Sequence, residues 1–254
     1  MKIDEFRKLN QDNQILHIGN VWDINSALIL QRNGYKALGT SSAAIASSLG
    51  YEDGEQMSFD ELFQICKQII SKINVPLSVD IEAGYSRDVK QIIKNIIALH
   101  DIGVVGINIE DSVVQNSKRE IEPKEKFAKL LEDIKIGLKE KNIDMFINAR
   151  TDNFIMGLDN PLQDTIKRIK SYEPYADGIF VPCIVDIEDI KEVAKATTLP
   201  INVMAMPGLA SFDILQKAGI KRASRGPFVY NGLVKYFENI IKTVRKDNSF
   251  ESIF

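Results

Sequence analysis

Short apolar runs recur along the chain and alternate with longer segments in which apolar residues return every three to four positions. Several of the short runs are almost continuously apolar, which is typical of parallel strands covered on both faces. The pattern predicts strands at Leu16–Gly19, Ala37–Thr40, Leu77–Ile81, Val105–Glu110, Phe146–Thr151, Gly178–Val181, Ile201–Met204 and Arg222–Ser224.

The segments between these runs have helical periodicity. In Phe59–Ile73, the residues Leu62, Cys66 and Ile69 recur at spacings of four and three and form one apolar face. Gly103 follows such a segment, at a position where helices commonly end. The predicted helices are Phe59–Ile73, Val89–Ile102, Pro123–Lys139, Leu162–Tyr172, Ile187–Ala196, Ser211–Ala218 and Leu233–Val244.

The repeated order of strand and helix favours an α/β protein with a parallel sheet. An α/β barrel takes about 250 residues, and this chain has 254. No Gly-x-Gly-x-x-Gly motif follows the first predicted strand, which argues against a dinucleotide-binding open sheet. We therefore predict a single (β/α)8 TIM barrel domain over residues 1–254, with an extra N-terminal helix and an apolar C-terminal helix.

Composition and charge exclude several classes of partner. The net charge is −3, and the 32 basic residues form no block of the kind that binds nucleic acid or a membrane surface. The N-terminal segment has no apolar signal region, and no apolar stretch approaches the roughly 20 residues that span a bilayer. The two cysteines, Cys66 and Cys183, lack metal-ligand spacing and a disulfide-rich context. We expect a cytoplasmic protein.

Acidic side chains gather where consecutive predicted strands end. Asp80 and Glu82 end the third strand, Glu110 ends the fourth, and Arg150 lies at the end of the fifth. Active sites of α/β barrels lie at this end of the strands. Clustered carboxylates repel one another, and a hard cation such as Mg²⁺ or Mn²⁺ relieves the repulsion. We predict a metal site at Asp80, Glu82 and Glu110; the alternative is that these acids cap helices and pair with Arg150.

Other polar residues at this end are candidates for binding a substrate. Arg150 suits a substrate carboxylate, although a structural ion pair is also consistent with its position. The small, hydroxyl-rich turn after the second strand offers backbone N–H groups to an anion. The following loop, residues 47–55, is either a mobile lid carrying Asp53 or a solvated loop. The predicted substrate contacts are Trp22, Ser41, Ser42, Ala43, Asp80, Arg150 and Asn202.

Six motifs, in order along residues 19–225, resemble those of the isocitrate lyase/phosphoenolpyruvate mutase superfamily: WDINSA, GTSSAAIASSLGYEDGE, VDIEAGY, VGINIEDS, INARTD and GIFVP. The likeness is strongest to the short phosphoenolpyruvate phosphonomutase-like members. It implies a barrel whose last helix is exchanged between subunits of a homodimer or homotetramer. It also implies Mg²⁺-dependent chemistry on a C–C or P–C bond next to a 2-oxo acid, through a pyruvate enolate.

The resemblance also assigns roles to individual residues. It gives Asp80, Glu82 and Glu110 to Mg²⁺, some of them through water. It gives the Ser41, Ser42 and Ala43 turn to the pyruvyl carboxylate, Arg150 to the substrate, and Asp53 to the gating loop. We therefore predict catalytic roles for Asp53, Glu110 and Arg150.

One segment departs from the lyases of this superfamily. Isocitrate and methylisocitrate lyases carry a Lys-Lys/Arg-Cys-Gly-His segment after the fourth strand, and its cysteine acts as acid or base. This chain has the loop 112–121 there, without a cysteine. Asn116-Ser117 resembles the Asn-Ser of phosphonopyruvate-handling members, and we interpret Lys118 and Arg119 as solvated rather than as contacts for a distal anionic group.

Three functions fit these residues. The first is a Mg²⁺-dependent lyase that cleaves a C–C bond next to a 2-oxo or 2-hydroxy acid, with Tyr51, Tyr85 or Asp53 as the proton donor. The second is P–C bond chemistry of the mutase or hydrolase type. The third is a non-catalytic protein that binds a dicarboxylate. A Schiff-base aldolase requires a lysine at a strand end, and the predicted strands have none there.

Overall fold

The computed structural model describes residues 1–115 and 118–254. Within these ranges, eight parallel strands close into a barrel in the order β1-β10-β9-β8-β7-β4-β3-β2, which confirms the predicted TIM barrel. Each predicted strand is present, with ends moved by two residues at most. The barrel strands are β1 (Leu16–Val21), β2 (Leu38–Thr40), β3 (Leu77–Asp80), β4 (Gly106–Glu110), β7 (Phe146–Arg150), β8 (Gly178–Val181), β9 (Ile201–Met204) and β10 (Arg222–Ser224).

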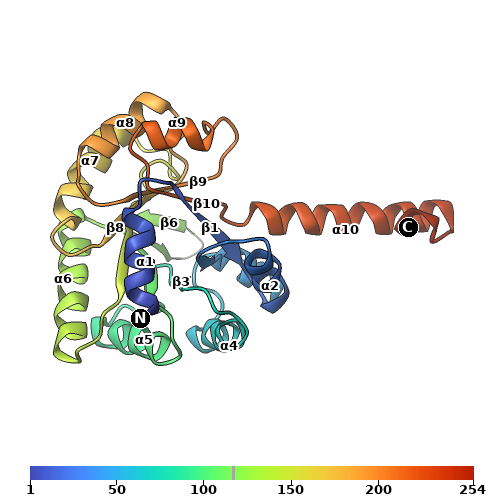
Figure 1. Ribbon diagram of the computed structural model, residues 1–254, viewed down its shortest axis with the longest axis horizontal. Helices are drawn as coiled ribbons and strands as arrows, with labels where there is room; N and C mark the ends of the chain where they lie inside the picture. The colour runs from blue at the N-terminus through green and yellow to red at the C-terminus, as the bar shows by residue number, and fades with distance from the viewer. Residues whose placement is uncertain (116–117) are drawn as a thin grey trace.

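Helices surround the barrel (Figure 1), and every helix predicted from the periodicity is present. Several begin at a side-chain cap: Ser58, for example, accepts a hydrogen bond from the backbone N–H of Glu61 at the start of α4. The helices are α1 (Lys2–Gln11), α2 (Ile24–Arg32), α3 (Ser42–Ser48), α4 (Phe59–Ile70), α5 (Val89–Asp101), α6 (Lys124–Glu140), α7 (Pro161–Tyr172), α8 (Ile187–Lys195), α9 (Phe212–Lys217) and α10 (Phe228–Asp247).

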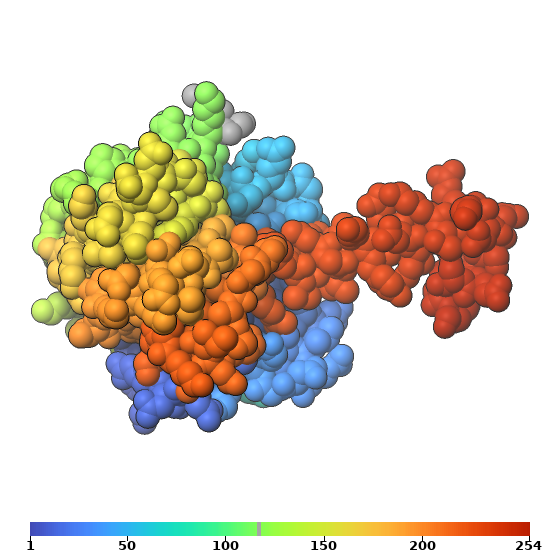
Figure 2. Space-filling view, turned by 90° about the horizontal axis from the view of Figure 1, so that it is seen from above, coloured from blue at the N-terminus to red at the C-terminus, as the bar shows by residue number. Residues whose placement is uncertain are grey.

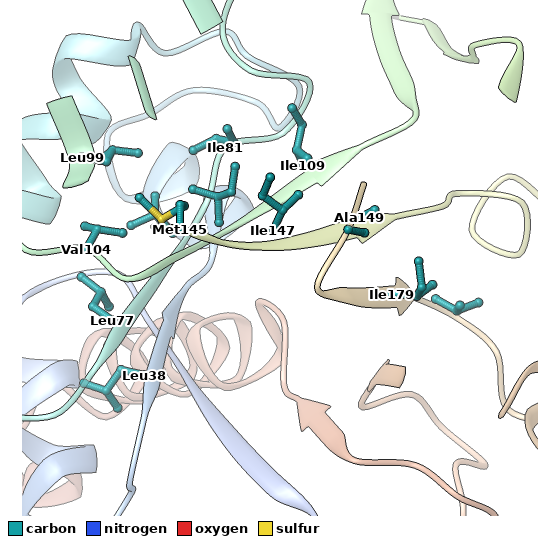
Figure 3. Packing of buried hydrophobic residues seen from close by; sticks show 14 of the residues in the cluster. Leu38, Leu77, Ile81, Leu99, Val104, Ile109, Met145, Ile147, Ala149 and Ile179 are labelled. Atoms are coloured by element: carbon teal, nitrogen blue, oxygen red, sulfur yellow. The ribbon is translucent and has the colours of Figure 1, made fainter. Parts of the chain in front are cut away.

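Strand residues alternate between an apolar outer layer and a polar interior. Ile107 and Ile109 of β4 belong to the apolar layer under the helices, part of which, including Ile109, is labelled in Figure 3. Asn108 and Glu110 therefore point into the barrel. The same alternation in the other strands gives the interior Asn20, Ser78, Asp80, Asn148, Arg150, Asn202, Arg222 and Ser224, all buried. Burial of so many polar groups is unfavourable unless each finds a partner.

The N-terminal helix α1 covers the end of the barrel at which the strands begin. Its Phe6 is fully buried, and the ring meets that of Phe146 edge to face at 5.2 Å. Leu16, Ile18 and Val105 complete this cluster at the strand starts. The extra N-terminal helix predicted from the sequence is therefore present, and it places an apolar plug beneath the polar interior.

Two elements differ from the sequence expectation. The residues after β2 form the short helix α3, whose N-cap Ser41 accepts a hydrogen bond from the N–H of Ala44, and not an open turn. The residues after β4 form an antiparallel hairpin of β5 (Ser112–Gln115) and β6 (Lys118–Ile121), and not an irregular loop. Asn116 and Ser117, which resemble the Asn-Ser of phosphonopyruvate-handling members, lie outside the described residues.

The C-terminal helix α10 projects from the barrel as an isolated rod in both views (Figures 1 and 2). It is 20 residues long, and none of them is buried. Its exposed side chains include Leu233, Tyr236 and Phe237, the last 66% exposed. In the described part of the chain, no helix combines the length and apolarity that crossing a membrane would require.

Candidate active site

A cavity of about 260 Å³, here called the central cavity, lies at the C-terminal ends of the barrel strands. Its wall includes Pro182 and Cys183, which follow β8, and Gly226, which follows β10. Drug-sized ligands occupy pockets of about 300–1,000 Å³, so this cavity suits a smaller molecule. Of the residues predicted from the sequence, Ser41, Ser42, Ala43, Asp53, Asp80 and Arg150 line it.

Asp80 at the end of β3 is the carboxylate most directly presented to the central cavity. Its Oδ2 accepts a hydrogen bond of 3.0 Å from the hydroxyl of Ser42, and its backbone N–H donates to the hydroxyl of Thr40. Its Oδ1 is buried and has no hydrogen-bond partner among the described residues. Burial raises the pKa of Asp80, and the positive charge of Arg150 opposes that effect. One carboxylate oxygen is thus left available for a ligand.

Glu82 is buried beside the loop that carries Asp53. Its backbone has φ = 48°, in the left-handed region, and the side chain turns toward that loop. There its two oxygens accept hydrogen bonds from the backbone N–H of Glu55 at 2.8 Å and the hydroxyl of Tyr85 at 3.1 Å. Burial raises the pKa of Glu82 to about 8, and repulsion from Asp53 adds to the effect. Glu82 therefore anchors the loop and does not line the central cavity.

Glu110 and Arg150 form part of a buried charge network with Asp152. The Nε and Nη2 of Arg150 donate to the two oxygens of Asp152 at 2.6 and 3.1 Å. Its Nη1 lies 2.8 Å from Oε2 of Glu110. Burial raises the pKa of Glu110, opposed by the charge of Arg150. All three nitrogens of the Arg150 guanidinium therefore face carboxylates of the protein.

Arg119 of the hairpin reaches into the same network, so the interpretation that it is solvated is wrong. Its Nη1 donates to Glu110, to the hydroxyl of Ser112 at 2.8 Å and to Asp152 at 3.1 Å. Its Nη2 donates to Asp53 at 3.3 Å. The position was missed because a basic residue in a polar segment gives no sign of burial, whereas the β5–β6 pairing directs Arg119 inward.

Two predicted contacts lie away from the central cavity. Trp22 lines a separate apolar groove of about 450 Å³ between α2 and α10, where its ring packs against that of Tyr230 at 5.3 Å. The side-chain amide of Asn202 donates to the carbonyl of Val203 and the hydroxyl of Ser224 inside the barrel. Trp22 directly follows the end of β1, and Asn202 lies two residues before the end of β9, so being near a strand end in the sequence did not place either of them in the cavity wall.

The three predicted metal ligands do not converge on one point. Outside residues 116 and 117, no three His, Cys, Asp or Glu side chains gather closely enough to hold a metal ion. The reason is that Glu82 is engaged by the loop and Glu110 by two arginines. One oxygen could still bind a hard cation. Oδ1 of Asp80 is a buried carboxylate oxygen that has no hydrogen-bond partner in the described chain.

Arg222 is a cavity-lining residue that the sequence did not indicate. It stands at the start of β10, whereas site residues were sought at the ends of strands. Its long side chain nevertheless reaches the wall of the central cavity. The signal that would have found it is the alternation within β10, which directs Arg222 and Ser224 to the same inner face.

Comparison with known proteins agrees with this architecture. A family model described as phosphoenolpyruvate phosphomutase matches residues 6–245. A Mycobacterium tuberculosis protein described as uncharacterised is 31% identical over 227 residues, which cover 89% of this chain and 83% of that protein. The 2-methylisocitrate lyase of Halalkalibacterium halodurans is 24% identical over 256 residues, covering 98% of this chain and 84% of the lyase.

A solved structure extends the agreement to three dimensions. A candidate phosphonomutase from Burkholderia cenocepacia superimposes with a TM-score of 0.88 at 31% identity, covering 95% of this chain and 99% of that one. The match of the family model over nearly the whole chain and the shared barrel lead to one conclusion. The chain belongs to the phosphoenolpyruvate phosphomutase family, within the isocitrate lyase/phosphoenolpyruvate mutase superfamily.

Proposed function

We propose that the protein is a Mg²⁺-dependent lyase that cleaves a C–C bond next to a 2-oxo or 2-hydroxy acid. The observation that carries the proposal is Asp80, whose Oδ1 is buried in the wall of a small cavity and has no partner in the described chain. A second support is the likeness to a 2-methylisocitrate lyase along nearly the whole chain. The small cavity volume, about 260 Å³, favours a short-chain acid.

The residues around Asp80 have distinct tasks in this proposal. Asp80 would be the carboxylate that holds the cation, while Glu82 and Glu110, engaged by the loop and by two arginines, would add negative charge around it. The Ser42 hydroxyl fixes the Asp80 side chain by its hydrogen bond to Oδ2. Ser42 and Ala43 begin α3, where backbone N–H groups lack an intrahelical acceptor and can bind the substrate carboxylate. When bound, Mg²⁺ supplies positive charge beside the oxygen on which negative charge develops.

Asp53 is the best-placed of the proton donors considered from the sequence. The hydroxyl of Tyr51 donates to Glu61 at 2.9 Å, and that of Tyr85 donates to Glu82 at 3.1 Å. Neither tyrosine lines the central cavity, whereas Asp53 does. The Nη2 of Arg119 donates a hydrogen bond to Asp53 at 3.3 Å. We assign the proton transfer that follows bond cleavage to Asp53 on this geometry.

The reaction is tested by incubating the protein and Mg²⁺ with 2-methylisocitrate, isocitrate, oxaloacetate and phosphonopyruvate. Pyruvate, glyoxylate, succinate and phosphate are measured as products. The proposal expects Mg²⁺-dependent release of a 2-oxo acid from a C–C substrate, lost in Asp80→Asn and retained in Asp213→Asn, a matched change on the exposed surface of α9. Phosphate release or isomerisation of phosphonopyruvate would instead identify P–C chemistry. Tight binding of every acid without turnover would identify a dicarboxylate-binding protein.

The exposed helix α10 supports a second proposal, that the protein is a homodimer or homotetramer in which this helix packs on a neighbouring copy. None of its 20 residues is buried within one chain. Its apolar residues Val229 and Leu233 line the groove beside α2, together with Ile29. A monomer would leave this apolar surface in water, which soluble proteins avoid. The mass in solution by light scattering tests this proposal.

A further inference from the structure

Arg222 occupies the inner end of the central cavity. Its side chain is 2% exposed, and the guanidinium carbon lies 5.7 Å from the centre of the Phe6 ring that closes the barrel below it. Its Nη2 donates to Oδ1 of Asn108 at 3.3 Å. Asn108 is paired in register with Asp80 on the neighbouring strand. The guanidinium therefore lies between the apolar plug and the layer of the barrel that contains Asp80.

Arg222 forms no direct salt bridge with a described residue, and the acid whose charge acts on it is Asp80, which raises its pKa. Its Nε and Nη1 are buried without a hydrogen-bond partner there. Burial lowers the pKa of Arg222 to about 9, so the group still carries its charge at neutral pH. The contrast with Arg150 is direct, because Arg150 also lines the cavity but has its nitrogens on Asp152 and Glu110.

A purely structural role does not account for this arrangement. A buried charge without a partner destabilises the fold, and an apolar side chain of the same length would fill the space at less cost. Residues that reduce stability in this way are characteristic of binding sites, where a ligand supplies the missing partner. Because Arg222 lines the central cavity, that ligand is an anion that enters from the cavity.

We propose that Arg222, assisted by Asn108, binds a second carboxylate of the substrate at the inner end of the central cavity, so that the enzyme acts on dicarboxylates in preference to monocarboxylates. The inference rests on the proposed function for the first carboxylate and for the cation at Asp80. It gives the cavity two anion-binding positions, one at the Ser41–Ala43 segment and one at Arg222. Malate, a four-carbon dicarboxylate with a 2-hydroxy group, would offer one carboxylate to each of these positions.

The test compares malate with lactate, which has the same 2-hydroxy acid group but a methyl group in place of the carboxymethyl group of malate. Affinities are measured by calorimetry with Mg²⁺ for the wild type and for Arg222→Met, which keeps the length of the side chain and removes the charge. We expect the variant to bind malate about 10- to 100-fold more weakly, as for loss of a charged hydrogen-bonded pair, and to bind lactate as the wild type does. Its melting temperature is expected to equal or exceed that of the wild type.

Each other outcome overturns a stated part of the inference. Equal weakening of malate and lactate, or a lower melting temperature with unchanged malate binding, would assign Arg222 a structural role. If the wild type with Mg²⁺ bound malate no more tightly than lactate, the second carboxylate position would be refuted and the proposed function would still stand. Malate binding that requires Arg222 but is indifferent to Mg²⁺ would keep the position and contradict the metal proposal. A second variant, Arg222→Lys, is expected to restore part of the malate affinity.

Discussion

Replacing Arg119 with methionine removes the positive charge that the β5–β6 hairpin carries into the buried acidic network. Arg119 donates to Glu110 and Asp152, which are 2% and 0% exposed, and to the hydroxyl of Ser112 between them. Methionine has a similar length and keeps the apolar contacts of the stem, so the change reports on the charge. Both acids would retain Arg150 as a partner.

The magnitude follows from burial. Removing one member of a buried ion pair costs about 3–5 kcal/mol, because the remaining charge is left without compensation. The lower end applies here, because Arg150 still forms a salt bridge with each acid and Arg119 is itself 21% exposed. We therefore expect the free energy of unfolding to fall by about 3 kcal/mol, which for a domain of this size lowers the melting temperature by about 6–12 °C.

Urea and thermal denaturation measure the effect, with Lys118→Met as the matched control. Lys118 precedes Arg119 on β6, carries the same charge and is exposed. Its replacement is expected to change the free energy of unfolding by less than about 0.5 kcal/mol. If Arg119→Met and Lys118→Met were equally stable, the network around Glu110 would not contribute to stability as argued.

Four further predictions concern other parts of the molecule. Phe6→Ala, which empties the plug beneath the barrel, is expected to lower the free energy of unfolding by about 3–5 kcal/mol in urea denaturation; a loss below 1 kcal/mol would contradict the role of α1. Cys183, at the cavity wall, is expected to react slowly with a thiol reagent at neutral pH, to be protected by a cavity ligand, and to react faster at alkaline pH, because burial raises its pKa and the thiolate is the reactive form. Cys66, fully buried with a pKa raised to about 12, is expected to react only after unfolding, and modification of native Cys66 would refute this. On α10, Phe237→Glu is expected to reduce the mass in solution by light scattering while Lys235→Glu does not; equal masses would argue against the packing of α10 on another copy.

The apolar pattern predicted the barrel because burial determines most of it. The outward residues of each strand lie under helices, and their spacing leaves a regular signal in the sequence, as at Ile107 and Ile109. The hairpin left no such signal. Its strands have only four residues each, and Gln115 and Lys118 are exposed, so no apolar pattern is long enough to indicate a strand. The helix α3 was missed because serine and alanine dominate it, and serine is equally at home in a turn.

The sequence predicted where the candidate site lies better than it predicted which of its charged side chains pair with one another. Asp80, Glu110 and Arg150 end strands that are neighbours in the barrel, so the topology alone brings them near each other. What the sequence could not indicate is which charges pair. The left-handed backbone of Glu82 turns its carboxylate to the loop, and this conformation is rarely inferred for a residue other than glycine or asparagine. Arg119 depends in the same way on hairpin pairing.

We propose that Asp80 holds a divalent cation that helps to bind a 2-oxo acid in the central cavity. The most direct test of this proposal is calorimetric titration of oxalate, a stable mimic of such an acid, into the wild type and Asp80→Asn, each with and without Mg²⁺. We expect oxalate to bind the wild type only with Mg²⁺. We expect Asp80→Asn to bind it more than about 100-fold more weakly, which is a larger loss than follows from replacing a residue that only hydrogen-bonds to a metal ligand. Oxalate binding that is independent of Mg²⁺, or equal in Asp80→Asn, would contradict the account.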